Sequence, residues 1–204
     1  MAKNRGFLIG CGAVAGVVVI LALILFFWGK GIYNNMITLE EGVNESWSQV
    51  ENVYQRRADL IPNLVETVKG VAEFERGTFT AVTEARSKVN QINVSPQMLE
   101  NPQLFSQFQS AQGELGSALS RLLVTVENYP QLKANENFLQ LQAQLEGTEN
   151  RIAVERRRFN VTVRGYNTTI KTFPNVMFAN IFNFNEKVYF QAAEGADQAP
   201  QVEF

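Results

Sequence analysis

The feature that most constrains this chain is residues 7–28, a long apolar run without a charged side chain. A helix over this run would be about 33 Å long at about 1.5 Å per residue, enough to cross the hydrocarbon core of a bilayer. The run ends in Phe26, Phe27 and Trp28, and aromatic residues are enriched at membrane interfaces. The sequence therefore predicts a transmembrane helix over residues 7–28, preceded by a short N-terminal segment over residues 1–6.

Two other interpretations of the apolar run are a cleaved signal peptide and a lipoprotein signal. A signal peptide has a shorter apolar core and a small-residue cleavage site, whereas this run is long and ends in aromatic residues. Residues 8–11 resemble a lipobox that would make Cys11 a lipid-bearing N-terminus. Only about four apolar residues precede Cys11, however, and the usual apolar region has about 7 to 15. We expect an uncleaved helix, with lipidation of Cys11 as the open alternative.

The charges that flank the run predict its orientation. Lys3 and Arg5 precede it, whereas Lys30 alone follows closely behind, and the next charges are Glu40 and Glu41. Cytoplasmic flanks of membrane helices carry an excess of Lys and Arg. We therefore expect the N-terminus in the cytoplasm and the rest of the chain outside.

The composition excludes several classes of function. The 204 residues include one Cys and no His, so a Ser-His-Asp triad, a Cys-His pair or a His-ligated metal site cannot be assembled from this chain. The formal net charge of -2 is not that of a nucleic-acid-binding protein, which needs a clearly basic face. We expect no enzyme activity, no cofactor, no metal and no nucleic-acid partner.

Beyond the apolar run, apolar residues recur at spacings of three and four, which predicts an all-α fold. One such stripe predicts a helix from about residue 34 to residue 91. Pro62 interrupts this stripe, and proline removes one backbone hydrogen bond and clashes one turn back. We therefore expect a kink or a short break between Asp59 and Pro62.

Two further helices follow. The second should begin with Asn101 as its N-cap and end before Pro130, and the third should be capped by Asn135 or Asn137 and end before Pro174. Three long amphipathic helices joined by short loops predict an antiparallel bundle of coiled-coil type.

The C-terminal region is rich in aromatic residues. From Asn175 we expect a short helix and then an extended segment that caps one end of the bundle, with the aromatic side chains packed in the core rather than against a membrane or a partner. The predicted domains are a bundle over residues 29–184 and an extended or disordered tail over residues 185–204, disordered over its last ten residues. The aromatic residues are Phe178, Phe182, Phe184, Tyr189 and Phe190.

Several motifs of this chain resemble those of the LemA family of bacterial membrane proteins. They occur in order and without large gaps from about residue 29 to residue 184. The resemblance implies a bacterial membrane protein with one N-terminal span, a mostly helical body and no established catalytic activity. We expect the span in the inner (cytoplasmic) membrane. The motifs are WSQV at 47–50, YQRRADLIPNLV at 54–65, VKG at 68–70, ENYP at 127–130, LKAN at 132–135, TEN at 148–150, FN at 159–160, YN at 166–167 and FP at 173–174.

Three charged residues fall on the predicted apolar stripes, one of them Glu75, which follows Val71 on the stripe of the first helix. Arg57 lies between Tyr54 and Ile61 on the first helix, and Glu155 lies on the stripe of the third. A charge inside a bundle must be paired, or it costs several kcal/mol. We expect a buried structural ion pair between Arg57 and Glu149 or Glu155, with a polar ligand site as the alternative. Carboxylate metal sites in bundles usually also use Glu-x-x-His, and this chain has no His.

Polar residues on the third helix permit two interpretations. A polar seam for a ligand would be lined by Glu149, Asn150, Asn160 and Asn167, although for the asparagines hydrogen bonds between helices are the favoured interpretation. Residues 156–158 are three consecutive arginines. Because consecutive residues of a helix point in different directions, we expect a solvated face there rather than one anion site.

The favoured function is a non-enzymatic scaffold that self-associates and presents helix surfaces to protein partners, which the sequence does not identify. The first predicted helix would reach about 87 Å and the second only about 42 Å. Trp47, Val50 and Tyr54 would then lack a partner within the chain. Neighbouring subunits would cover them, unless a sharp bend at Pro62 folds the first helix back.

The membrane helix adds a second argument for a homo-oligomer. Its first half carries Gly6, Gly10, Gly12 and Gly16, two pairs of small residues each one turn apart. Such spacing lets helix backbones approach closely in lipid. The alternative function is a ligand or signal sensor, in which the polar seam binds a small molecule and transmits a helix shift to the membrane.

Overall fold

The computed structural model describes the backbone of residues 3–70 and 76–191 and the side chains of residues 15–70 and 77–191. Within these ranges every regular element is helical, which confirms the all-α prediction. The disorder predicted for residues 195–204, the position of Glu75 and the state of the Cys11 side chain lie outside the described residues. The elements are α1 (Lys3–Lys69), α2 (Arg76–Gln91), the 3-10 helix η1 (Pro96–Glu100), α3 (Pro102–Val126), α4 (Pro130–Lys133), α5 (Glu136–Lys171) and α6 (Asn175–Phe182).

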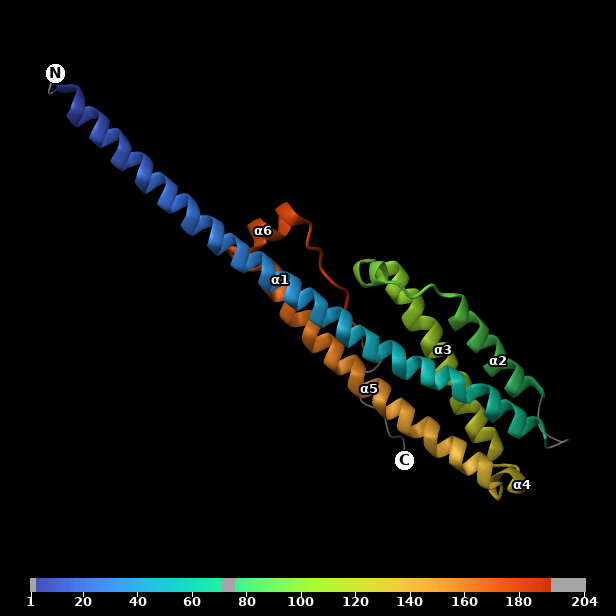
Figure 1. The fold of residues 1–204 in the computed structure, drawn as a ribbon. Coiled ribbons are helices and arrows are strands. Elements are labelled where there is room, and N and C mark those ends of the chain that lie inside the picture. The colour runs from blue at the N-terminus through green and yellow to red at the C-terminus, as the bar shows by residue number, and fades with distance from the viewer. Residues whose placement is uncertain (1–2, 71–75, 192–204) are drawn as a thin grey trace, which may run out of the picture.

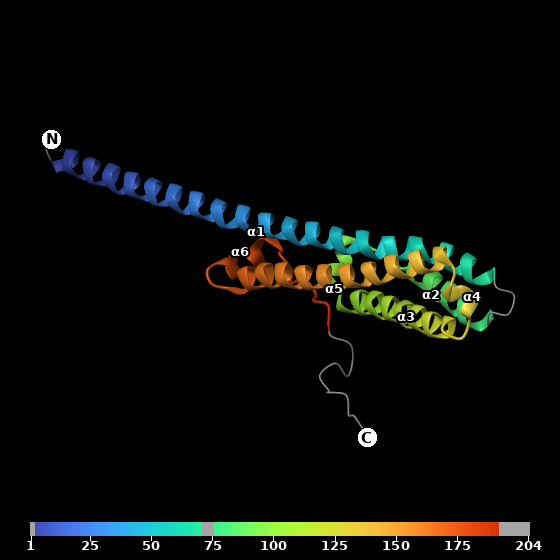
Figure 2. The ribbon, with the colours of Figure 1, turned by 90° about the horizontal axis from the view of Figure 1, so that it is seen from below.

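The helix α1 is a rod that carries the rest of the chain on its C-terminal part (Figure 1). Its N-terminal part extends alone beyond the body of the molecule, and α5 runs antiparallel along the remainder (Figures 1 and 2). The helices α2 and α3 form an antiparallel pair at the end far from the N-terminus. The short helix α6 lies beside α1 at the opposite end of the body.

The helix α1 continues through Pro62, where the sequence predicted a kink or a short break. Proline has no N–H with which to bond the carbonyl of Ala58, four residues earlier. That carbonyl instead accepts a hydrogen bond of 3.0 Å from Arg86 Nε of α2. The short break at Pro62 is absent because a neighbouring helix satisfies the carbonyl that the proline leaves free. A bend at Pro62 stays a prediction.

The single helix predicted over residues 34–91 is wrong, because two helices occupy this range. The helix α1 ends at Lys69, and α2 begins at Arg76 and runs back along the bundle. Val68 of α1 and Val82 of α2 enter the same core, which explains why apolar spacing alone joined the two helices. Within the described residues, α1, α2, α3 and α5 therefore pack together at this end, where the sequence predicted three helices.

The core has two parts along α1. The distal core, far from the N-terminus, is mostly aliphatic and is built from α1, α2, α3, α4 and α5. The proximal core is rich in aromatic side chains and is built from α1, η1, α3, α5, α6 and the C-terminal segment. Buried members of the distal core include Ile61, Leu64, Val68, Val82, Leu115, Leu122, Leu132 and Leu145. Those of the proximal core include Met36, Trp47, Tyr54, Phe105, Phe108, Phe159, Tyr166 and Phe190.

Asparagine side chains set three helix ends. The side chain of Asn101 accepts hydrogen bonds from first-turn amides of α3, as predicted. Asn135, rather than Asn137, caps α5 in the same way. The helix α6 ends at Asn183, whose φ of 58° lies in the left-handed region, which asparagine adopts more readily than most residues.

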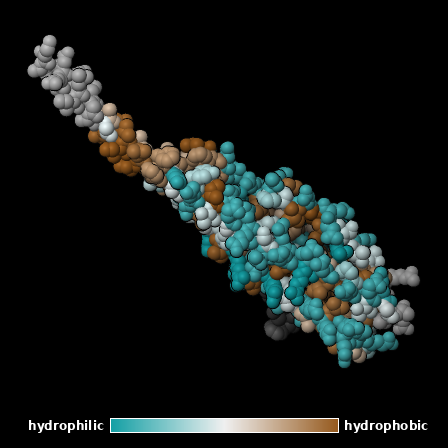
Figure 3. All heavy atoms as spheres, viewed as in Figure 1, coloured by the Kyte–Doolittle hydropathy of each residue, from teal (hydrophilic) through white to brown (hydrophobic). Residues whose placement is uncertain are grey.

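The unaccompanied part of α1 is apolar. The large apolar side chains from Val17 to Trp28 are each about half exposed or more. They form the brown stretch between the grey N-terminal atoms and the mostly teal body (Figure 3). Among the described helices, α1 is the one whose length and composition would allow it to cross a membrane.

Candidate functional site

Arg57 projects from α1 toward α3 and α5. Its side chain is 3% exposed, and its Nη1 donates to Glu149 Oε1 on α5 at 2.9 Å. Its Nη2 donates to the backbone carbonyl of Gln112 on α3 at 3.3 Å, and also to Oε1 of the same glutamine. One buried guanidinium therefore links three helices, and the structure brings Arg57 to one of its two candidate carboxylates.

Glu155, the other candidate, points elsewhere. It follows Glu149 by six residues, which turns it by about 240° around the helix axis. Its carboxylate lies 2.9 Å from Arg158 Nη1, three residues further along α5. The proposed pair of Arg57 with Glu155 is absent for this reason.

A cavity of about 570 Å³ opens beside Arg57. Its charged lining is Arg57, Arg156 and Glu149, so cationic groups outnumber carboxylates there. Burial raises the pKa of Tyr54, which also lines the cavity, against the opposing charges of Arg156 and Arg57. Tyr54 is therefore a neutral phenol at neutral pH. This lining suits an anionic group, and it contains neither Cys nor His to act as a nucleophile or base.

Residues 184–191, which we name the C-terminal strap, run in an extended conformation along α5. Asn167 Nδ2 donates to the carbonyl of Lys187 at 2.8 Å, and the backbone N–H of Lys187 donates to Asn167 Oδ1 at 2.9 Å. Asn160 makes the same two bonds with Phe190, each at 2.9 Å. The seven-residue step from Asn160 to Asn167 rises by about 10.5 Å along α5, and the three-residue step from Lys187 to Phe190 covers about 10 Å of extended chain. The two asparagine side chains therefore lie opposite the two strap residues that they bind.

These contacts correct the interpretation of the asparagines. Asn160 and Asn167 bind the strap, rather than another helix or an open seam, and Asn150 is exposed. Gln109 on α3 makes a third two-way contact, with the backbone of Gln191, at 2.9 and 3.2 Å. The three contacts involve only the backbone of the strap, so they hold its path whatever its side chains are.

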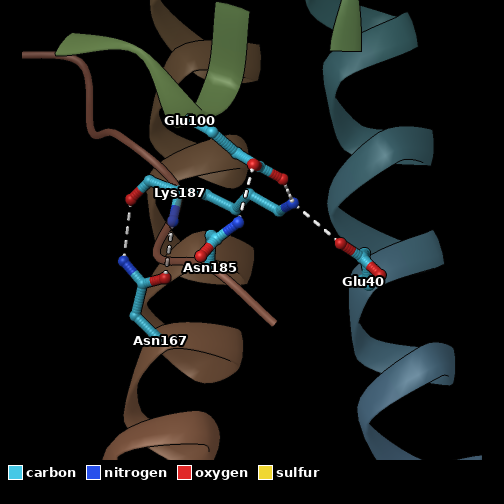
Figure 4. A network of polar contacts seen from close by, with 5 residues as sticks. All are labelled: Glu40, Glu100, Asn167, Asn185 and Lys187. Atoms are coloured by element: carbon cyan, nitrogen blue, oxygen red, sulfur yellow. Dashed lines mark hydrogen bonds and ion pairs between the residues drawn. The ribbon is translucent and has the colours of Figure 1, made fainter. Parts of the chain in front are cut away.

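Lys187 places a buried charge between three elements (Figure 4). Its side chain is 5% exposed, and its Nζ lies 2.7 Å from Glu40 Oε1 on α1 and 2.5 Å from Glu100 Oε1 at the end of η1. Asn185 Nδ2 donates to Glu100 Oε2 at 3.1 Å. The same Nζ lies 5.5 Å from the centre of the Tyr166 ring, within the range of a cation–π contact.

The surroundings of Lys187 set the charge states of two neighbours. Burial opposes ionisation of Glu100, but hydrogen bonds from Lys187 and Asn185 and the charge of Lys187 outweigh it, so the pKa of Glu100 is lowered. Burial raises the pKa of Tyr166, and the charges of Glu40 and Glu100 raise it further. At neutral pH, Glu100 is therefore ionised and Tyr166 is neutral.

No motif or apolar spacing in the sequence singles out Lys187, Glu40 or Glu100 as site residues. The signal that could have pointed toward them is the spacing of Asn160 and Asn167, two amides on one face of α5 whose common partner must extend over about two helical turns. The partner is a short extended segment, which has no helical periodicity to reveal it.

Arg156 departs from the solvated face predicted for residues 156–158. Its guanidinium carbon lies 4.5 Å from the centre of the Phe190 ring, and its Nη2 donates to the carbonyl of Gln191 at 3.2 Å. Arg157 and Arg158 are exposed, as predicted. One arginine of the run therefore fastens the strap to α5.

The predicted oligomer surface at Trp47, Val50 and Tyr54 is wrong. These side chains are 4%, 0% and 7% exposed within a single chain. The ring of Trp47 lies 5.4 Å from that of Phe159 on α5 and 6.0 Å from that of Phe190 on the strap. The prediction compared the length of the first helix with that of the second alone. The helix α5 is about 54 Å long and lies along much of α1, and the strap covers the remaining part of these side chains.

The structure describes the surroundings of the glycines in the predicted membrane helix only in part. The surroundings of Gly6, Gly10 and Gly12 lie outside the described side chains. A Cβ atom at Gly16 would meet nothing within 4 Å, so this face of α1 is open. The association predicted through these glycines stays a prediction.

The model of the LemA family matches residues 46–204 of this chain. The chain is 28% identical over 181 residues to Magnetosome protein MamQ 1 of Paramagnetospirillum magneticum, which covers 81% of this chain and 66% of that relative. It is 26% identical over 171 residues to Protein LemA of Metamycoplasma hominis, with 84% of this chain and 74% of that relative covered. The chain thus spans just under two thirds of the MamQ relative. It is a member of the LemA family.

Proposed function

We propose that this protein is a membrane-anchored, non-enzymatic interaction protein of the bacterial inner membrane. Residues 7–28 span the bilayer, residues 1–6 lie in the cytoplasm, and the bundle of residues 29–184 presents its helix surfaces outside to protein partners. The observation that carries the proposal is the exposed apolar stretch from Val17 to Trp28. An exposed apolar surface of this extent is suited to lipid rather than to water.

Two observations support a non-enzymatic role. The composition, with one Cys and no His, lacks the side chain that most often serves as a general acid or base in enzymes. The names of the relatives, MamQ and LemA, are not names of enzymes.

The topology is tested by labelling single cysteines in intact spheroplasts with a membrane-impermeant maleimide, in a Cys11→Ala background. Val124→Cys, on the exposed far end of α3, should be labelled without permeabilisation. Asn4→Cys, the matched control on the other side, should be labelled only after permeabilisation. The reverse pattern would overturn the proposed orientation, and labelling of both in intact spheroplasts would overturn the span.

Self-association is proposed through the glycine pairs of the membrane helix. Close approach of two helix backbones in lipid needs small residues at the contact, and the face around Gly16 is open. Native mass spectrometry in lipid nanodiscs should give more than one chain for the natural protein and one chain for the Gly12→Ile, Gly16→Ile double variant. Val18→Ile is the control that leaves the glycines in place. A single-chain mass for the natural protein would contradict this part of the proposal.

The second candidate function is ligand sensing, favoured by the cavity beside Arg57. Its two guanidinium groups face one carboxylate, so a small carboxylate is the ligand class that the charges fit. Succinate should raise the melting temperature of the natural protein and leave that of Arg156→Gln unchanged. No shift in the natural protein would contradict this function and leave Arg57 as a structural ion-pair residue.

A further inference from the structure

Residues 172–184, which include α6, contain no charged side chain. Phe173, just before the helix, is 81% exposed, and Met177 and Ile181 on the helix are 56% and 69% exposed. The four-residue spacing of Met177 and Ile181 places both on one face of α6, whereas Ala179 is 3% exposed. One side of α6 is therefore an uncharged apolar surface open to the surroundings.

This concentration of exposed apolar residues is specific to α6. Apart from Tyr33, whose ring lies against Phe182 of α6, exposed large apolar side chains in the remainder of the described body are scattered over α3, α5 and the strap. Soluble monomers rarely leave a contiguous apolar patch uncovered unless it has a binding role. The scattered residues are Leu104, Val124, Leu139, Val154, Val161 and Tyr189.

The helix α6 lies at the level where the predicted membrane span ends (Figure 1). The ring of Phe178 lies 5.8 Å from that of Trp28, and the ring of Phe182 lies 4.9 Å from that of Tyr33. A Cβ atom at Gly29 would come within 3.0 Å of the Phe178 ring, so glycine lets this ring sit against the backbone of α1. The apolar surface of α6 is thus continuous with the apolar surface of α1.

We infer that α6 is a second membrane contact, an interfacial helix whose apolar face enters the boundary between lipid headgroups and acyl chains on the side of the bundle. The inference rests on the proposed membrane span of residues 7–28. Interfacial helices bury their apolar face by about 5–10 Å at this boundary. Trp28 marks the boundary, because tryptophan favours headgroup level, and its ring touches α6.

The charge pattern selects lipid as the occupant. The charges on either side of the segment, Lys171 and Glu186, pair with each other at 2.7 Å, and the residues between them that carry polar side chains are uncharged. Membrane binding here rests on apolar area rather than on attraction to anionic headgroups. Neutral lipid is therefore sufficient.

The contact has a mechanical consequence. A lone membrane helix leaves the bundle free to rotate about the axis of α1, whereas α6 adds a second point of attachment to one side of that axis. The strap follows α6 directly and is held by Asn160 and Asn167. The attachment therefore fixes which face of the bundle turns toward the membrane and which is presented to partners.

The experiment uses the full chain in phosphatidylcholine vesicles, with a Cys11→Ala background and an environment-sensitive fluorophore on one cysteine. Ile181→Cys reports α6. Val124→Cys is the matched control, since it is 67% exposed where Ile181 is 69%. Leu23→Cys reports the membrane span. Lipids that carry a nitroxide quencher just below the headgroup, or deep in the acyl chain, measure the depth of each label.

We expect shallow nitroxide lipids to quench the label at position 181 about twofold, as expected for an interfacial depth, and to leave the label at position 124 unchanged. The label at position 23 should respond to the deep quencher. If position 23 is quenched and position 181 is not, the inference about α6 fails while the span stands. If neither is quenched, the span itself fails. A third outcome would also overturn the inference. If the fluorophore at position 181 reports an apolar environment only at a high protein-to-lipid ratio, and nitroxide lipids do not quench it, a second copy of the chain covers α6.

Discussion

The distal and proximal halves of the bundle solve the same packing problem in different ways. Around the distal core, α2 and α3 cover α1 and α5, so helices meet helices. Around the proximal core, η1, the first turns of α3 and the C-terminal strap provide much of the cover. A helix bonds its own backbone, whereas an extended segment leaves its N–H and C=O groups to be satisfied by neighbours. The proximal half therefore needs side-chain amides where the distal half does not.

This difference determines where each half is vulnerable. The distal core spreads its stability over many apolar contacts, each of modest size. The strap depends on a small set of polar groups, among them Asn160, Asn167 and Lys187. Single polar substitutions should therefore open the proximal half selectively, and Arg57, between the two cores, should affect both.

The largest effect is expected for Arg57→Ala, which removes hydrogen bonds to two helices at the junction of the halves. We expect a loss of about 3 kcal/mol in the free energy of unfolding. Because Glu149 is 45% exposed, water can solvate its carboxylate once Arg57 is removed. The loss of stability is therefore smaller than for a fully buried ion pair. Urea titration of the detergent-solubilised chain measures the loss. The control Arg157→Ala, on the exposed face of α5, should change little, and equal effects of the two would show that Arg57 does not hold the helices together.

Lys187→Met should rank next, with a loss of about 2 kcal/mol, moderated by the partial exposure of Glu40 and Glu100. The pKa of Glu100 is lowered from 4.5, so its contribution is present above that pH and is lost as the pH falls through the lowered value. The difference in melting temperature between the variant and the natural protein should be largest at neutral pH and shrink in acid. The control Lys171→Met removes an exposed pair and should show neither effect. A difference in melting temperature that does not change with pH would show that the contribution of Lys187 does not depend on the charge of Glu100.

Asn160→Leu should cost about 1–2 kcal/mol, because the N–H and C=O of Phe190 lose their partner. The loss should appear as faster hydrogen exchange at the strap and in the neighbouring part of α5, with the distal core unchanged. Asn150→Leu is the control, since Asn150 is exposed on the same helix. Equal exchange in the two variants would show that the amide contact does not hold the strap.

The smallest effect concerns the distal half. Arg86→Met should cost about 1 kcal/mol, because the carbonyl of Ala58 loses its donor. Pro62→Ala restores a backbone N–H for that carbonyl, so Arg86→Met should cost less in the Pro62→Ala background. A double-mutant cycle measures this coupling, and additive losses would mean that Arg86 does not compensate for the proline.

Much of the fold can be predicted from local sequence patterns. The uncharged run, the apolar spacing and the Asn101 cap are local patterns, and each predicted helical structure where the protein has it. The apolar spacing nevertheless joined α1 and α2 into one helix. Arg57 was informative because a charge on an apolar stripe requires a partner, which the structure supplies in Glu149.

The features that local signals missed depend on contacts distant in sequence. Pro62 does not break α1, because Arg86 on another helix bonds the freed carbonyl. The turn at Gly70 was hidden because Val68 and Val82 continue one apolar pattern into a shared core. The cover over Trp47 was missed because Phe190 comes from an extended segment far along the chain.

The most direct test of the account is hydrogen exchange, measured by mass spectrometry, on the natural chain and on a chain that ends at Asn183 and so lacks the strap. Without the strap, backbone amides of the proximal half, residues 36–54 and 159–170, should exchange faster by about tenfold or more, while those of the distal half, residues 61–68 and 115–122, keep their protection. Unchanged exchange in the proximal half, or an equal loss of protection in both halves, would contradict the claim that the strap closes the proximal half.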